Sequence, residues 1–395
     1  MGDIPNNRIP KGAVPARMGQ VVPDQKRPNR ASKLYANPGM RGPHLLAQDY
    51  LPVNGKGGED LSGPYEPVEG WPQPIEEGWR IAGAAALHVF SPDRIMVVSH
   101  FGLMRERVTP YVWGLSTFSM EGSPYATHSL NAAIEKKPEH HVVVFDRAGE
   151  LVESWTWNDH LFAKLNRIFV DPHDPEEHVW VTDSRNQKIY KFTRDGKQLV
   201  MTIGEIEAGS IPSDPWKGQD MAWLPNGDFY TAGLGRIDRF DKNGELQFSI
   251  LRRGSGPGEF LDLHGLVLDQ ERHRIYVADR GNSRIQVFDE DFTFIEEWPN
   301  ILGPYALRLT QDGYIWVGDG ETQKFLKYDL EGKLVTSWGQ LGVAPGATLG
   351  IHWFDVDEEG NLYVAENHGD RVQKFRPRSD VDPNDPRFIG PLVRY

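Results

Sequence analysis

The sequence predicts an all-β fold, a closed ring of six blades with four short antiparallel strands each. One pattern, strand, acidic turn, polar residue and strand, returns along the chain roughly every 40 to 50 residues. Within each copy, apolar and polar residues alternate with a period of two, which is typical of strands with one buried face. The composition also fits, because 41 Gly, 29 Pro and 12 Trp among 395 residues suit many strands joined by turns.

Four copies of this repeat are the clearest. Their centres are VWVTDSRNQKIYKF from Val179, IYVADRGNSRIQVF from Ile275, IWVGDGETQKFLKY from Ile315 and LYVAENHGDRVQKF from Leu362. One more apolar strand precedes each, in NRIFVD, HGLVLD, YALRLT and HWFDVD. A shorter copy spans residues 219–250, and a degenerate first copy spans residues 80–155. Six such copies predict a six-bladed β-propeller, since ring closure removes exposed sheet edges.

The segment before the repeats predicts an extended arm. Residues 1–77 are rich in Pro and Gly, so we expect an arm there and the propeller in residues 78–395. Eight Lys and Arg stand against two Asp in residues 1–48, whereas the whole chain has a net charge of −13. A basic arm beside an acidic body predicts that the arm docks either on that body or on a neighbouring subunit, and the length of the arm favours a homo-oligomer. The alternative is a disordered tail.

A long insertion interrupts the first blade. Residues 101–138 are aromatic and rich in Met, and they are far longer than a hairpin requires. We expect this insertion to cover the channel mouth, with Trp113 and His128 in a substrate pocket. The alternative is that it packs against the arm or a neighbouring subunit.

Charge and hydropathy exclude several classes of partner. A net charge of −13 argues against nucleic-acid binding. The sequence contains no run of 18 apolar residues, so it predicts no membrane span, and its first 20 residues do not resemble a secretory signal. The absence of Cys excludes disulfides, thiolate ligands and cysteine nucleophiles. We therefore expect a cytoplasmic protein with a small-molecule substrate.

Equivalent positions of the inner strands carry polar side chains. Aligned on the acidic turn and on the residue that closes the inner strand, the six blades place at one position Ala86, Asn166, Gln219, His264, Tyr305 and His352. Buried polar groups need partners, so this repetition predicts a ring of ligands facing the channel. Asn166, His264 and His352 alternate around the ring and form a candidate metal site. An Asn ligand would favour Mn²⁺, Fe²⁺ or Ca²⁺ over Zn²⁺.

The repeats resemble a known family. GSGPGEF before His264 and DRGNSRIQVF after it resemble the NHL repeat, and the alternating ligands resemble peptidyl-hydroxyglycine amidating lyases, over roughly residues 80–377. The resemblance implies Zn²⁺ held by three channel histidines and a structural Ca²⁺ in the channel. His264 and His352 fall on two ligand positions, and Asn166 falls on the third. Trp353 stands where the family has an aspartate.

Two other family residues lack a counterpart. Gly233 to Gly235 face the position of the family tyrosine. The family arginine of the first blade falls near Phe101, and Arg105 and Arg107 are the nearest candidates. The resemblance therefore implies the scaffold and part of the metal site, with an altered reaction.

The sequence thus predicts a metal-dependent lyase, hydratase or hydrolase that acts on a small polar molecule in the channel. The resemblance favours Zn²⁺. Tyr305 is a candidate base or hydrogen-bond donor, and Arg105 or Arg107 would hold a carboxylate or enolate. The remaining pocket candidates are Gln219, Trp353, Trp113 and His128.

Two other functions stay open. The propeller face could instead bind a protein or peptide as a scaffold. A calcium-dependent lactonase-type hydrolase is the third reading, because Asp220 and Asp262 lie close in sequence to the ring positions.

Overall fold

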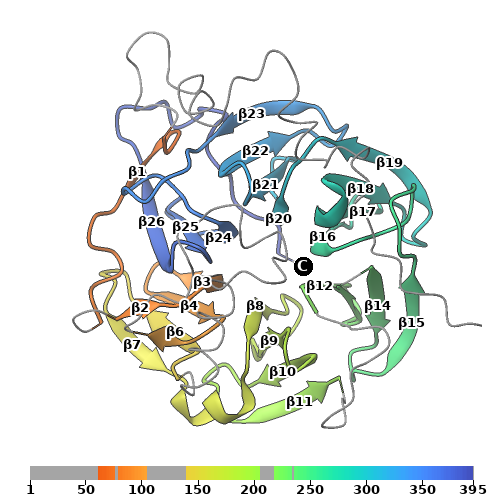
Figure 1. The fold of residues 1–395 in the computed structure, drawn as a ribbon, viewed down its shortest axis with the longest axis horizontal. Helices are drawn as coiled ribbons and strands as arrows, with labels where there is room; N and C mark the ends of the chain where they lie inside the picture. Colours follow the sequence, from red (N-terminus) through yellow and green to blue (C-terminus); the bar gives the residue numbers. More distant parts are fainter. Residues whose placement is uncertain (1–60, 76–78, 105–138, 205–217, 234, 395) are drawn as a thin grey trace, which may run out of the picture. The chain divides into compact units, whose positions relative to one another are not determined.

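Six four-stranded antiparallel sheets are arranged radially around a common centre in the compact unit Gly58–Tyr395 (Figure 1). The computed structural model describes residues 61–75, 79–104, 139–204, 218–233 and 235–394. Sequential hairpins build each blade outward from the centre, as expected where short strands are separated by tight turns. The predicted six-bladed propeller of four-stranded blades is confirmed.

The first five blades are each built from strands in chain order, and the first blade omits β5. From the inner to the outer strand, the first blade comprises β3 (Ala84–Ser91), β4 (Arg94–Ser99), β6 (Val142–Phe145) and β7 (Leu151–Ser154), and the second comprises β8 (Leu165–Val170), β9 (Val179–Asp183), β10 (Lys188–Phe192) and β11 (Leu199–Ile203). The third blade comprises β12 (Asp220–Trp223), β13 (Phe229–Ala232), β14 (Arg236–Phe240) and β15 (Leu246–Leu251), and the fourth comprises β16 (Leu263–Asp269), β17 (Arg274–Asp279), β18 (Arg284–Phe288) and β19 (Phe294–Pro299). The fifth blade comprises β20 (Pro304–Leu309), β21 (Ile315–Asp319), β22 (Lys324–Tyr328) and β23 (Leu334–Trp338).

The sixth blade joins the two ends of the propeller. It comprises β24 (Ile351–Val356), β25 (Leu362–Glu366), β26 (Arg371–Pro377) and, as its outer strand, β1 (Tyr65–Pro67). Tyr65 pairs with Pro377, and Pro67 pairs with Phe375. The ring is therefore closed by a strand from the region where the sequence predicted the arm to continue as far as residue 77. A three-residue strand that ends in Pro gives no period-two signal, although Pro is tolerated in an edge strand.

Tryptophans and turn glycines lock neighbouring blades together. Trp155, at the end of the first blade, is fully buried, and a Cβ on Gly196 of the next blade would come within 2.3 Å of its ring. Trp298 and Gly332 repeat this contact between the fourth and fifth blades, also at 2.3 Å. Both glycines have positive φ, +68° and +80°, so a side chain there would be strained as well as crowded.

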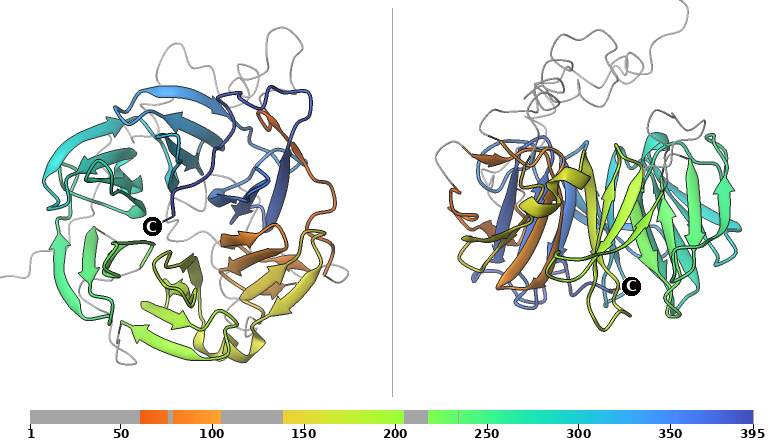
Figure 2. Two further views of the ribbon diagram at one scale, coloured as in Figure 1. Left: turned by 180° about the vertical axis from the view of Figure 1, so that it is seen from behind. Right: turned by 90° about the horizontal axis from the view of Figure 1, so that it is seen from below.

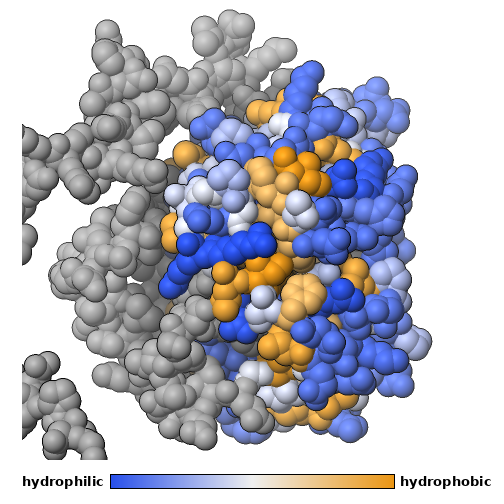
Figure 3. Space-filling view, turned by 90° about the vertical axis from the view of Figure 1, so that its right-hand side faces the viewer, coloured by the Kyte–Doolittle hydropathy of each residue, from blue (hydrophilic) through white to orange (hydrophobic). Residues whose placement is uncertain are grey.

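Minor elements and the outer surface complete the unit. β2 (Arg80–Ile81) pairs with β5 (Leu103–Met104), and two 3₁₀ turns are present, η1 (Thr156–Leu161) and η2 (Arg280–Asn282). Figure 3 shows apolar side chains among hydrophilic ones on the outer side of the ring. Exposed Leu246, Phe248, Leu251 and Ile295 belong to the outer strands β15 and β19. The described part of the chain contains no helix that is long and apolar enough to span a membrane.

Candidate functional site

The inner strands carry a β-bulge at equivalent places. In five blades the pairing register with the second strand shifts at one residue near the start of the inner strand, at Ala85, Asn166, His264, Tyr305 and His352. A bulge residue lies outside the ladder and its side chain is re-aimed. This explains how side chains from separate blades can meet at the centre. The count along the sequence placed the first-blade position at Ala86, one residue late, because the inner strand of this blade has a second register shift between Val89 and Ser91.

Three predicted residues meet at the end of the ring where the inner strands begin, which we call the upper site. The His264 ring centroid lies 4.9 Å from that of His352 and 4.6 Å from that of Tyr305. Both histidines are 2% exposed, and Tyr305 is 4% exposed. Burial lowers the pKa of His264 and of His352 well below the usual value, and nearby guanidinium groups lower it further. Both imidazoles are therefore neutral at physiological pH.

A third imidazole, from His100, joins them. Its ring centroid lies 5.2 Å from that of His352, and burial again lowers its pKa well below the usual value. His100 directly follows β4, the second strand of the first blade. The equivalent residue of the fourth blade is Arg280, directly after β17. The inner-strand alignment missed both residues, and an alignment of the positions that follow the second strands would have found them.

The three histidines share one hydrogen-bond pattern. Nδ1 lies 2.7 Å from Leu165 O in His100, 3.0 Å from Tyr305 O in His264 and 2.6 Å from Ala85 O in His352. Each oxygen belongs to the inner strand of an adjacent blade. An Nδ1–H that donates to a backbone carbonyl leaves the Nε2 lone pair for a metal or a proton, as in metal-bound histidines.

Arg167 fills the centre of the ring next to these histidines. Its side chain is fully buried, and its guanidinium donates to Asn166 O at 3.1 Å and to Tyr305 O at 3.2 Å. It also lies 2.8 Å from Nδ1 of both His264 and His352. The 2.6 Å contact between His352 Nδ1 and its carbonyl needs a proton between the two atoms, so that proton stays on Nδ1. Burial lowers the pKa of Arg167 only to about 10, so this residue remains a cation.

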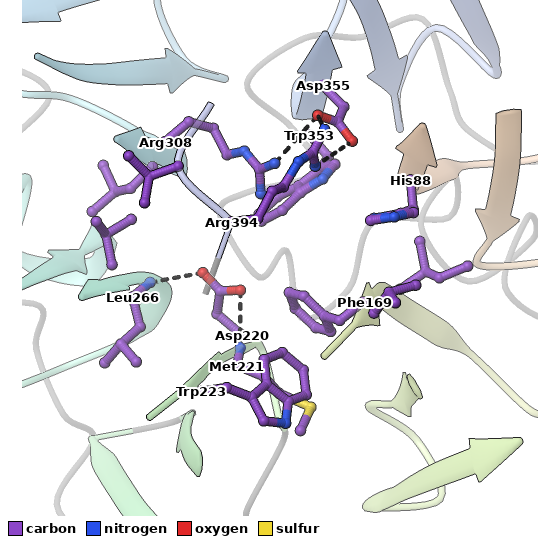
Figure 4. Close-up of a pocket in the computed structure, with 15 residues that line it drawn as sticks. His88, Phe169, Asp220, Met221, Trp223, Leu266, Arg308, Trp353, Asp355 and Arg394 are labelled. Carbon is purple, nitrogen blue, oxygen red and sulfur yellow. Dashed lines mark hydrogen bonds and ion pairs between the residues drawn. The ribbon is translucent and has the colours of Figure 1, made fainter. Parts of the chain in front are cut away.

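Two other predicted residues face elsewhere. Asn166 donates its side-chain amide to Gln219 Oε1, and no described contact joins Asn166 to either histidine. Trp353 packs under Arg167, 4.7 Å from the guanidinium carbon, and lines a cavity at the opposite end of the ring (Figure 4). The alternating triad expected from the sequence is therefore not assembled, because the amide is paired and a guanidinium occupies the centre.

Charged groups border the upper site beside Tyr305. The guanidinium carbon of Arg280 lies 4.5 Å from the Tyr305 ring centroid, and Arg280 forms an ion pair with Asp262. A quarter of the Arg280 side chain is exposed. Burial raises the pKa of Glu321 above its usual value, and Arg280 opposes this rise. The upper site thus combines neutral imidazoles, a phenol, a cation and a titratable carboxyl group.

The His352 imidazole is spaced from the other two imidazoles as rings that share one divalent metal would be. Two imidazoles that share one tetrahedral Zn²⁺ at ~2.0–2.1 Å have ring centroids about 5 Å apart. The His352 ring lies at 5.2 and 4.9 Å from the other two. The described residues nevertheless contain no group of three His, Asp or Glu already close enough to hold a metal. Metal binding therefore requires the rings to turn toward one another.

The remaining predicted residues lie either outside the described residues or in other contacts. Arg105, Arg107, Trp113 and His128 lie outside the described residues. Of the lactonase candidates, Asp262 pairs with Arg280. Asp220 accepts backbone hydrogen bonds from Met221 at 2.9 Å and from Leu266 at 2.7 Å on the side of the ring away from the histidines.

Comparisons with known proteins agree with the fold and the repeat. Residues 239–324 match a family model described as a 6-bladed beta-propeller. NHL repeat-containing protein 3 of Homo sapiens is 29% identical over 265 residues, which cover 62% of this chain and 74% of that protein. The class is thus a six-bladed β-propeller, with sequence similarity to an NHL repeat-containing protein.

Within that class, the chain also resembles amidating lyases. A Caenorhabditis elegans protein described as a probable peptidyl-alpha-hydroxyglycine alpha-amidating lyase is 28% identical over 284 residues, 60% of this chain and 79% of that protein. Peptidyl-alpha-hydroxyglycine alpha-amidating lyase 1 of Drosophila melanogaster is 29% identical over 240 residues, 57% of this chain but only 40% of that protein. The similarity to the lyase family expected from the sequence is thereby confirmed.

Proposed function

We propose that the protein is a divalent-metal-dependent lyase, hydratase or hydrolase that acts on a small polar molecule at the upper site. His100, His264 and His352 would hold the metal through Nε2, with Zn²⁺ as the favoured ion. The observation that carries this proposal is the meeting of three neutral imidazoles whose Nδ1 atoms all lie within hydrogen-bond distance of backbone carbonyls. The similarity to proteins named as amidating lyases supports it.

The bound ion supplies a Lewis acid that polarises a carbonyl or acidifies a hydroxyl. Tyr305 and Arg280, beside the proposed metal ligands, would supply a hydrogen-bond donor and a positive charge. Burial raises the pKa of Tyr305, although the Arg280 cation opposes this rise, so the phenol stays protonated at neutral pH and donates a hydrogen bond or a proton. Arg280, stacked on that phenol, attracts a carboxylate or a developing anion on the substrate.

Metal content tests the proposal directly. Purified wild-type protein should carry about one divalent ion per chain. His100→Ala, His264→Ala and His352→Ala should each lose it, because each removes one of three ligands. His273→Ala is a matched control, since that side chain is 70% exposed and lies outside the site. Elemental analysis and the absorption spectrum of Co²⁺-loaded protein are the readouts.

Asn166→Ala separates this ligand set from the one expected from the sequence. It should retain the metal, because the Asn166 amide is paired with Gln219. Full metal retention in all three histidine variants would contradict the proposal and favour the scaffold reading, in which the propeller face binds a protein or peptide. Loss of the metal in Asn166→Ala, but not in His100→Ala, would favour the alternating set instead.

A further inference from the structure

An arginine side chain occupies the opposite end of the ring, which we call the lower mouth. Arg394 approaches Asp355 with both terminal nitrogens, Nη1 at 2.9 Å from Oδ2 and Nη2 at 2.8 Å from Oδ1 (Figure 4). Nη2 also lies 3.4 Å from Val356 O. This two-point contact between a guanidinium and a carboxylate is a strong and geometrically selective ion pair. Lysine cannot reproduce it, because an ammonium is a point charge.

The carboxylate of Asp355 is held in place without Arg394. Val89 N donates to Oδ2 at 3.0 Å and Val356 N donates to Oδ1 at 2.9 Å. Arg308 adds an ion pair to Oδ1 at 3.2 Å. Asp355 is fully buried, and burial acts to raise its pKa, but Arg394 and Arg308 outweigh this effect and bring the pKa down to about 2. With Arg394 in place the carboxylate is therefore charged at physiological pH, and its two backbone hydrogen bonds and the Arg308 ion pair do not depend on Arg394.

The segment that carries Arg394 is attached to the propeller like a bound peptide. Pro391 O accepts a hydrogen bond from Gln311 N, and Val393 N donates to Leu309 O, both at 2.8 Å. Between them, Leu392 forms an antiparallel bridge with Thr310. The segment thus adds a short strand beyond the end of β20, a recurring mode of peptide recognition. Figure 2 shows that it reaches the face opposite to the one that carries η1.

Part of the Arg394 side chain is exposed, and there is space beside the ion pair. The Arg394 side chain is 36% exposed, whereas that of Asp355 is 1% exposed. A cavity of about 40 Å³ adjoins the ion pair and is lined by His88, Asp220 and Trp353 among others (Figure 4). A cavity of this size has room for ordered water.

We propose that the lower mouth is a receptor for a guanidinium group presented on an extended strand. Arg394 fills it in cis, and an arginine-bearing peptide of a partner fills it when residues 391–394 detach. Because the segment is covalently attached, Arg394 is present at a high effective concentration and competes with guanidinium groups of other molecules for Asp355. The site is separate from the upper site, and the inference does not depend on the proposed metal.

Removal of the resident guanidinium tests the receptor in the full chain. In Arg394→Ala the mouth is vacated while the backbone bonds of Val393 remain. Methylguanidinium chloride should then bind about tenfold more tightly than methylammonium chloride at equal ionic strength, because only the former bonds at two points. Isothermal titration and thermal melting are the measurements. The wild-type protein should show no such preference, because its site is filled.

Two further variants keep the test decisive. Arg394→Ala combined with Asp355→Asn should lose the preference for methylguanidinium. Arg394→Lys keeps the charge and should leave the site partly open to the same probe. Equal binding of the two cations, or a preference that survives Asp355→Asn, would overturn the guanidinium receptor.

A labelled peptide tests the partner strand. The double variant Leu392→Asp, Arg394→Ala should release the segment, because Leu392 is buried and a charge there is costly. A fluorescent blocked peptide of sequence PLVR should bind this variant, as measured by anisotropy, and should bind at least about tenfold more weakly when its Arg is replaced by Lys. Absence of peptide binding, with slow amide exchange still protecting Val393, would show that the contact is a fixed part of the fold and would overturn exchange with a partner.

Discussion

At the scale of single residues, Arg167 holds the centre of the ring. It donates to Asn166 O of its own strand and to Tyr305 O of another inner strand, and its removal leaves Asn166 O without this donor. Arg167→Met should lower the free energy of unfolding by about 2–4 kcal/mol, as measured by urea denaturation. Arg167→Lys should lower the free energy of unfolding by an intermediate amount, since it keeps the charge but not the planar guanidinium group. Arg185→Met, at an exposed position, is the control, and an equal loss in both Met variants would contradict this role.

Asp220 makes the stability of the folded protein depend on pH. Burial raises its pKa to about 7, although the Arg167 cation and backbone amides oppose this rise. In the folded state the carboxyl keeps its proton at pH values where the unfolded chain has lost it. Stability linked to Asp220 is therefore complete below pH ~4 and falls as the pH rises to about 7, by at most about 1.4 kcal/mol per pH unit.

Asp220→Asn isolates this contribution from other titrating groups. Burial also raises the pKa of Glu366 to about 7, so the wild-type curve alone is ambiguous. The wild type should lose stability relative to Asp220→Asn between pH 4 and 7, as read from denaturant unfolding at each pH. If the free energies of unfolding of the two proteins changed in parallel across that pH range, Asp220 would not titrate as its burial implies.

Site residues at equivalent positions of the inner strands were predictable from the sequence, whereas contacts fixed by tertiary packing were not. The repeat indicated His264, His352 and Tyr305, because equivalent positions in equivalent strands share one environment. His100 and Arg280 follow the second strands, so the alignment of the inner strands did not include them, although an alignment of these turn positions would have. The orientation of Arg167 toward the centre depends on the bulge at Asn166, which has no signal in a single sequence.

At the scale of elements, the closing strand β1 provides a test of ring closure. Tyr65 packs its ring 5.5 Å from that of Trp338, and its hydroxyl accepts a hydrogen bond from Ile389 N at 3.0 Å. Tyr65→Ala should destabilise the propeller by about 3–5 kcal/mol, whereas Tyr65→Phe should cost about 1 kcal/mol. Thermal unfolding followed by near-ultraviolet circular dichroism measures both. Val152→Ala, on an outer strand where this side chain is 55% exposed, should stay near wild type, and a similar loss in Val152→Ala and Tyr65→Ala would contradict the closing role.

At the scale of the whole molecule, we propose that the basic segment before the propeller mediates self-association. Residues 1–60 lie outside the described residues, and the expectation rests on their Lys and Arg content against an acidic remainder. Deletion of residues 1–60 should convert an oligomer to a monomer in light scattering. High salt should weaken the full-length oligomer, since exposed charge pairs are screened. An unchanged mass after deletion would assign self-association elsewhere, for example to the apolar outer strand β15.

The sequence by itself determined the number of blades, the strand order and two of the three central histidines. These features repeat, and a repeated environment leaves a repeated pattern of residue types. The tertiary structure alone decided that β1 closes the ring, that Asn166 pairs with Gln219, and that His100 and Arg167 meet the two predicted histidines. These contacts join segments that the chain brings together once, so no period in the sequence records them. The same holds for Arg394 at the lower mouth, whose partner Asp355 is set by the packing of two segments on one face of the ring.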